Sequence, residues 1–145
     1  MIIRVLDETR ANICDELLTK LIHEEKQYDN TVDINSKTEN YFKTIIKDST
    51  HYLLCYEEDN IIKGYTYLKP IIYNNKNGYI ISGLYVEEQY RRKGIGKKLM
   101  QEVIKILNKN PHEFVYINAF LKNQAAINLY RSFGFEPFKV TFELK

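Results

Sequence analysis

Hydrophobic positions along the chain recur with two different periods, and the change between them separates expected helices from expected strands. The stretch 2–6 is apolar enough for a short first strand. Apolar residues then recur every three to four positions over 9–28 and over 37–47, which predicts two amphipathic helices with a polar loop at 29–36 between them. We expect each helix to bury one face.

Strand-like segments follow in the middle of the chain. Residues 51–57 and 61–72 are predicted to be strands on either side of a polar turn at 58–60. The run 74–78 is rich in asparagine and ends in glycine, which indicates a second hairpin turn before a strand at 79–86. These neighbours in sequence are therefore expected to pair with one another.

The last third of the chain alternates again between helix and strand. Apolar positions with helical spacing predict a helix over 95–109, which ends before Pro111 because proline disfavours helical geometry in the residue that precedes it. A strand at 113–120, a helix at 123–133 and a last strand at 138–144 follow. The predicted order is βααβββαβαβ.

The most basic stretch of the chain, residues 91–98, joins an apolar strand to a helix and is here called the basic loop. The first N–H groups of a helix have no partner within the helix and lie at the positive end of its dipole, so they can bind an anion. Gly94 and Gly96 remove side chains that would obstruct a close approach. A phosphate-bearing cofactor is therefore expected here, on Arg91, Arg92, Lys93, Gly94, Ile95, Gly96 and Lys97.

Two common nucleotide motifs do not fit the basic loop. A dinucleotide fingerprint needs a third glycine where this chain has Leu99, and a triphosphate loop needs Ser or Thr where it has Lys98. The pattern that is present, Arg-x-x-Gly-x-Gly after a strand ending Leu-x-Val, resembles the pyrophosphate loop of the GCN5-related N-acetyltransferase superfamily. Members of that family bind acetyl-coenzyme A (acetyl-CoA) at this loop.

A second segment, 118–135, resembles the other signature of the same family. There a strand leads to an asparagine, then to a helix that carries a tyrosine, then to a glycine flanked by aromatic residues. The resemblance covers residues 79–136. It implies an α/β (α+β) fold in which residues 1–145 form one domain, with a mixed, mostly antiparallel sheet flanked by helices.

The resemblance also implies roles for individual residues. Tyr130 matches the tyrosine that commonly protonates the coenzyme A sulfur, and Asn123 matches an asparagine that contacts the cofactor. Seven residues separate the two, about two helical turns, so both side chains are expected on one side of the helix. Backbone N–H groups of the strand before the basic loop would bind the pantetheine arm and the acetyl oxygen, and Gly83 suits a bulge that would open that strand. These N–H groups belong to Leu84, Tyr85 and Val86.

The residue that removes a proton from the acceptor amine is left open by the sequence. The two positions at which family members carry a glutamate are occupied by Asn118 and Ile80. Glu87, Glu88, a residue of the N-terminal helices or a chain of water remain as alternatives, as does an amine that arrives deprotonated. The acidic residues that could attract a cationic amine are Glu24, Glu25, Asp29, Asp33 and Glu39.

Composition narrows the function further. The net charge of +2 gives little support to a nucleic-acid-binding module built on the basic loop. Cys14 and Cys55 lack metal or redox spacing and are expected to be small buried hydrophobes. No apolar run reaches the roughly 18 residues of a membrane span, and no signal peptide is apparent, so a cytoplasmic protein is expected.

The sequence thus predicts an N-acetyltransferase that moves an acetyl group from acetyl-CoA to a primary amine of a small molecule or peptide. The alternative is a protein of the same fold that binds acetyl-CoA without turnover, as a sensor or structural subunit. The expected partners are acetyl-CoA and an amine acceptor, with no metal, nucleic acid or membrane. A homodimer is compatible with the sequence.

Overall fold

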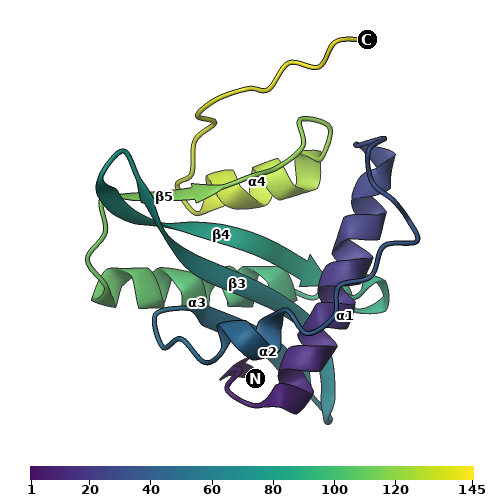
Figure 1. The fold of residues 1–145 in the computed structure, drawn as a ribbon, viewed down its shortest axis with the longest axis vertical. Coiled ribbons are helices and arrows are strands. Elements are labelled where there is room, and N and C mark those ends of the chain that lie inside the picture. The colour runs from purple at the N-terminus through teal and green to yellow at the C-terminus, as the bar shows by residue number, and fades with distance from the viewer.

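A five-stranded sheet forms the centre of the computed structural model, which describes residues 1–145 (Figure 1). Neighbouring strands are antiparallel except for the last pair, which is parallel, so the expectation of a mixed, mostly antiparallel sheet is confirmed. In spatial order the strands are β1 (Ile2–Arg4), β2 (Tyr52–Glu58), β3 (Ile61–Tyr73), β4 (Lys76–Val86) and β5 (Phe114–Ile117).

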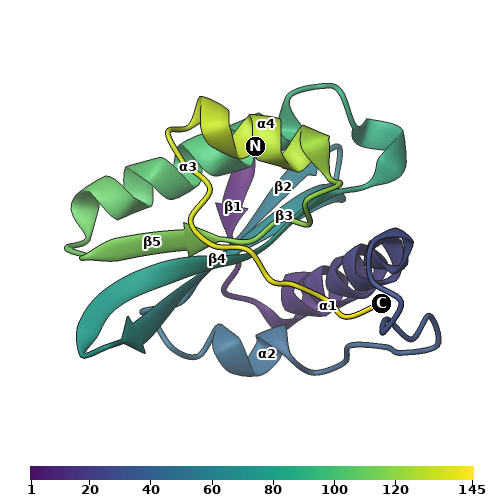
Figure 2. The ribbon, with the colours of Figure 1, turned by 90° about the horizontal axis from the view of Figure 1, so that it is seen from above.

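Helices cover both faces of this sheet (Figure 2). On one face lie α1 (Glu8–Glu24) and the short α2 (Phe42–Ile45), and on the other lie α3 (Ile95–Lys109) and α4 (Gln124–Ser132). Two short 3₁₀ turns, η1 (Glu25–Gln27) and η2 (Glu88–Tyr90), follow α1 and β4. None of the helices combines the length and the apolar composition needed to cross a bilayer.

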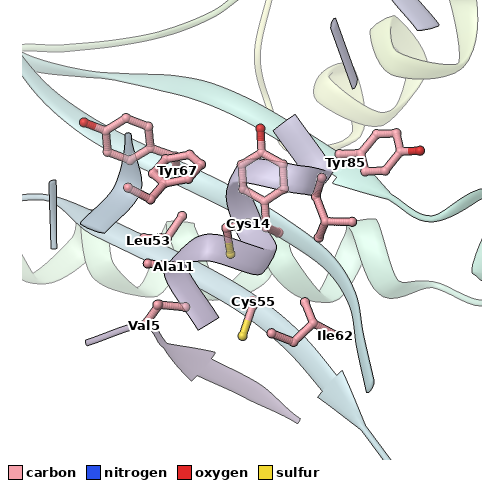
Figure 3. Close-up of a cluster of buried hydrophobic side chains, with 11 residues drawn as sticks. Val5, Ala11, Cys14, Leu53, Cys55, Ile62, Tyr67 and Tyr85 are labelled. Carbon is pink, nitrogen blue, oxygen red and sulfur yellow. The ribbon is translucent and has the colours of Figure 1, made fainter. Parts of the chain in front are cut away.

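The sheet separates two hydrophobic cores, and β2 contributes to both. Leu53 and Cys55 pack under α1 and α2, whereas Leu54 and Tyr56 face α3, as expected for alternate positions of a strand. Figure 3 shows the first core, in which Cys14 and Cys55 lie among apolar side chains. Both cysteines are free and buried, and burial raises the pKa of the Cys55 thiol to about 11. The expectation that they act as small hydrophobes is confirmed.

The two predicted hairpins are present. Asp59 and Asn60 have φ values of 55° and 62°, and Asn74 and Asn75 have 52° and 63°. Two consecutive residues with positive φ are the signature of the two-residue turn whose twist matches that of the strands it joins. Asparagine and aspartate adopt this conformation more readily than other non-glycine residues, so both turns lie within the predicted segments. The second turn is shorter than predicted, because β4 already begins at Lys76.

The second predicted helix, 37–47, is wrong in its extent, because α2 occupies only Phe42–Ile45. Asn40 has a φ of 59°, which is incompatible with a helix running through it. The N-terminus of α2 is instead fixed by the buried Asp15 of α1. One carboxylate oxygen of Asp15 accepts from the N–H of Phe42 at 3.0 Å and the other from the N–H of Tyr41 at 3.3 Å.

Replacing Asp15 by alanine should lower the free energy of unfolding by about 1–3 kcal/mol, because the buried N–H of Phe42 and the part-buried N–H of Tyr41 lose their acceptor. Asp15→Asn retains one acceptor oxygen and should lose less. Denaturant titration of both variants measures the difference. Equal stability of Asp15→Ala and the unmodified chain would contradict a capping role for this carboxylate.

The predicted last strand, 138–144, is also wrong. Phe138 stacks on Tyr116 of β5 at 5.1 Å between ring centroids, but the chain then leaves the body of the protein (Figure 1). Phe142 and Leu144 are 92% and 99% exposed. The alternation of apolar and polar residues gives this segment a strand pattern, but no strand lies beside it to supply hydrogen bonds. β5 itself is shorter than predicted, at four residues.

Candidate active site

A cleft opens where β4 and β5 separate. The two strands pair only from Gly78–Phe114 to Ile81–Ile117, after which β4 continues to Val86 paired with β3 but not with β5. The cleft has a volume of about 890 Å³ and is lined by residues of α1, η1, the end of β4, the basic loop and α4. It therefore passes through the sheet, so that side chains from opposite faces reach one space.

A bulge in β4 marks the start of this separation. Thr66 pairs with Leu84 and Leu68 with Ile81, so two residues of β4 lie opposite a single residue of β3. The hydroxyl of Thr66 donates to the carbonyl oxygen of Gly83 at 2.6 Å, within the bulge. The bulge predicted from Gly83 is confirmed.

The backbone of β4 beyond the bulge presents donors to the cleft. The N–H of Glu87 donates to the carbonyl of Lys63 on the β3 side, at 2.9 Å. Because successive N–H groups of a strand point in opposite directions, the N–H of Tyr85 also faces β3. The N–H groups of Leu84 and Val86 consequently face the side that β5 has left. Of the three residues expected to bind through the backbone, these two have the suitable direction.

The start of α3 offers a continuous row of unpaired donors. None of the six backbone N–H groups from Arg92 to Lys97 donates to an acceptor in the protein, and α3 has no side-chain cap. The turn that exposes them requires a φ of 65° at Arg92 and of 82° at Gly94. A non-glycine residue in this region is strained, and such strain concentrates at functional sites. The row fits the oxygens of a pyrophosphate.

Arg91 differs from the other basic residues of the loop. Its guanidinium holds both carboxylate oxygens of Glu24 at 2.8 Å and donates to the carbonyl of Val86 at 2.8 Å. The side chain thus ties α1 to the end of β4. By contrast, Arg92, Lys93 and Lys97 form no ion pair. These three side chains are exposed and free to neutralise a phosphate.

Asn123 and Tyr130 both line the cleft from α4, as their spacing predicts. The side-chain oxygen of Asn123 accepts from the N–H of Ala126 at 3.2 Å and so caps the helix. Its amide nitrogen has no partner and can donate to a ligand. The hydroxyl of Tyr130 makes no hydrogen bond with the protein. Burial, with a smaller contribution from the charge of Glu25, raises the pKa of Tyr130 to about 12.

The acidic residues considered as base or amine-binding group differ in whether they line the cleft and whether they already have a cationic partner. Asn118 and Ile80, at the two positions where family members carry a glutamate, both line the cleft. Glu87 is bound by the ammonium of Lys20 at 2.6 Å and Glu24 by Arg91, while Glu88 is exposed. Asp33 and Glu39 lie outside the cleft lining. Glu25 lines the cleft and has neither an ion pair nor a side-chain hydrogen bond.

One wall of the cleft was not foreseen from the sequence. The end of α1 and the residues after it contribute apolar side chains, namely Leu18, Leu21, Ile22 and Tyr28. Tyr28 stacks on Phe120, which follows β5, at 5.6 Å between ring centroids. Helical periodicity places Leu18, Leu21 and Ile22 on the apolar face of the helix but does not indicate which cavity they border.

One cleft thus combines a separated strand pair, a row of free N–H groups and a tyrosine without a hydrogen-bond partner. The sequence profile of the Acetyltransferase (GNAT) family matches residues 13–135. The chain belongs to this family. The match begins within α1 and ends just after α4, so it includes every element that lines the cleft.

Relatives within the GNAT family match part of the chain. An N-alpha-acetyltransferase of Sulfurisphaera tokodaii is 40% identical over 79 residues, which are 53% of this chain and 46% of the relative. A spermine/spermidine N(1)-acetyltransferase of Bacillus subtilis is 35% identical over 65 residues, 43% of each protein. The chain thus spans less than half the length of these relatives.

Solved structures of the same fold cover the chain completely. A tetramutant of the BH1408 protein from Bacillus halodurans has a TM-score of 0.83 at 20% identity, and the match covers 100% of this chain and 99% of that protein. An identity this low supports the fold alone. A possible acetyltransferase from Clostridium difficile 630 also has this fold, with a TM-score of 0.74 at 18% identity over 100% of this chain and 96% of that protein.

Proposed function

We propose that this chain is an N-acetyltransferase that transfers an acetyl group from acetyl-CoA to a primary amine of a small molecule or peptide. One observation carries the proposal: six consecutive unpaired N–H groups, Arg92 to Lys97, stand beside a strand whose neighbour has separated from it. The first feature suits a pyrophosphate and the second suits an extended arm that pairs with backbone. Coenzyme A has both parts.

The residues of the site would hold acetyl-CoA in a defined direction. The pyrophosphate would lie on the N–H groups of the basic loop, with Arg92, Lys93 and Lys97 supplying positive charge. The pantetheine arm would extend along β4 and bind the N–H groups of Leu84 and Val86. The amide of Asn123 would contact the cofactor from α4. The thioester would then lie within the cleft.

The chemistry needs a polarised carbonyl and a proton for the departing sulfur. A backbone N–H of β4 would polarise the acetyl oxygen. Tyr130 would donate its proton to the thiolate, and its position supports this role because the protonated hydroxyl lies in the cleft without a hydrogen-bond partner in the protein. The family relatives, which are named for acetyl transfer to α-amino groups and polyamines, support a primary amine as acceptor.

Binding and turnover test the proposal separately. Calorimetry should show that coenzyme A binds, and that binding weakens as salt is added, since phosphate contacts are screened. A coupled thiol assay with spermidine, with a peptide bearing a free α-amino group and with an aminoglycoside should detect release of coenzyme A. Binding without turnover of any amine would favour the alternative, an acetyl-CoA sensor. Failure to bind coenzyme A would contradict the proposal.

A further inference from the structure

We infer that Glu25 is the catalytic residue that receives the ammonium group of the acceptor and takes its proton. This inference rests on the proposed acetyl transfer. It assigns the base that deprotonates the acceptor amine, which the sequence leaves open. The two positions at which family members carry a glutamate are occupied here by Asn118 and Ile80, and neither side chain can accept a proton.

Glu25 and Tyr130 border the same cleft. Glu25 is the first residue of η1, directly after α1, and it lines the cleft together with Tyr130 of α4. The two residues come from opposite faces of the sheet and share one space because β4 and β5 separate there. The charge of Glu25 is close enough to affect the pKa of Tyr130.

The carboxylate of Glu25 is half-buried and has no partner, unlike its neighbour in sequence. Glu24 is held by the Arg91 guanidinium at two distances of 2.8 Å. Glu25 forms neither an ion pair nor a side-chain hydrogen bond, although much of the surrounding lining is apolar. A partly desolvated carboxylate without a cation is costly, and binding an ammonium group would offset that cost.

The charged and titratable groups around Glu25 favour proton uptake. Burial raises the pKa of Glu25 above its ordinary value, and the charge of Asp29 raises it further. Asp29 stays ionised because its hydrogen bonds with Thr31 lower its own pKa. Tyr130 on α4 and Tyr65 on β3 are neutral hydroxyls with raised pKa values. Of the two arginines that line the cleft, Arg91 is neutralised by Glu24, and neither forms an ion pair with Glu25.

The protons of the reaction balance with these two residues. The acceptor enters as an ammonium ion and gives one proton to the carboxylate of Glu25. The neutral nitrogen attacks the thioester carbon, the C–N bond forms and the C–S bond breaks, and Tyr130 protonates the sulfur. The nitrogen loses its second proton to the Tyr130 oxygen, which restores the hydroxyl. Glu25 returns its proton to solvent, so amide, thiol and one proton leave.

A pH profile of Glu25→Gln tests the inference, with the acceptor of highest turnover among spermidine, peptide and aminoglycoside. At pH 7 we expect kcat/KM for the amine to fall roughly 10²-fold, the usual contribution of a positioned base. The difference in kcat/KM between Glu25→Gln and the unmodified chain should become smaller as the pH approaches the pKa of the free amine, because more of the acceptor is then already neutral. Glu16→Gln, at an exposed position of α1, is the matched control and should behave as the unmodified chain.

A second variant tests the role of the Glu25 carboxylate by a substitution at a neighbouring residue. Asp29→Asn keeps an oxygen for the hydrogen bonds with Thr31 but removes a negative charge that raises the pKa of Glu25. At low pH Glu25 is protonated and cannot accept a proton, so kcat/KM falls on the acid side of the profile. In Asp29→Asn this fall should occur at lower pH. A structural role for Glu25 would not change the pH at which kcat/KM falls.

Stability separates loss of function from loss of folding. A carboxyl whose pKa is raised in the folded state destabilises that state as the pH rises through the interval between its unfolded and folded pKa values. Glu25→Gln removes this cost, so its melting temperature at pH 7 should equal or exceed that of the unmodified chain. A Glu25→Gln profile parallel to the unmodified one would overturn the inference and leave acetyl transfer intact. An unmodified chain without turnover would overturn the proposed function as well.

Discussion

Replacing Tyr130 by phenylalanine should lower kcat roughly 10²-fold while the affinity for acetyl-CoA stays the same. The hydroxyl lines the cleft without a protein partner, and its pKa of about 12 keeps it protonated at working pH. Its removal takes away the proton for the departing thiolate but keeps the ring that fills the space. Steady-state kinetics with a reactive acceptor, together with calorimetry of acetyl-CoA, measure the two quantities.

Tyr116→Phe is the matched control for this experiment. Tyr116 lies on β5, stacks on Phe114 and Phe138, and is not part of the cleft lining. It also loses one hydroxyl and should keep full turnover. A Tyr130→Phe variant with the same kcat as this control, at every pH tested, would remove Tyr130 from the mechanism and leave it as a packing residue of α4.

Replacing Gly96 by aspartate should weaken binding of acetyl-CoA by at least about 1–3 kcal/mol, or roughly 5- to 150-fold, because a carboxylate would repel the pyrophosphate and occupy its donors. The protein should nevertheless fold. An added Cβ at Gly96 has its nearest neighbours, side-chain carbons of Leu129 and Val86, at 3.9 Å. A negative charge in the first turn of α3 also interacts favourably with the helix dipole.

The Gly96→Asp variant is therefore expected to lose affinity for acetyl-CoA without losing stability. Gly96→Ala adds the Cβ without the charge and should lose less affinity than Gly96→Asp. The melting temperature of the aspartate variant should be equal to or higher than that of the unmodified chain. Calorimetry that finds full affinity in folded Gly96→Asp would place the pyrophosphate elsewhere.

The parts of the site that could be predicted from sequence are those encoded by a few consecutive residues. The basic loop is recognisable because Gly94 and Gly96 stand at a strand-to-helix junction among basic residues. Asn123 and Tyr130 share a side of one helix because of their spacing. In each case the local chain determines the geometry, and the structure places both sets at one cleft.

The parts that could not be predicted depend on contacts between distant segments. The extent of α2 is set by Asp15, 27 residues before Phe42, and by the left-handed conformation of Asn40. The pairing of Arg91 with Glu24 joins residues 67 positions apart, so nothing local indicates that this arginine has a carboxylate partner. Glu25 was one of several acidic candidates, and only packing of α1 against the sheet distinguishes it from the others.

The two walls of the cleft are supported by different hydrophobic cores, on opposite faces of the sheet, so each wall can change in sequence largely without the other. The basic loop, Asn123 and Tyr130 are supported by the core under α3 and α4, whereas the wall that includes Leu21 and Glu25 is supported by the core under α1 and α2. Substitutions distant from each other and without shared partners are close to additive in free energy. Under the proposed function, acceptor preference can therefore be altered at Leu18, Leu21 or Ile22 of α1 with little effect on the basic loop, whereas Glu24 has to be retained because it binds Arg91 of that loop.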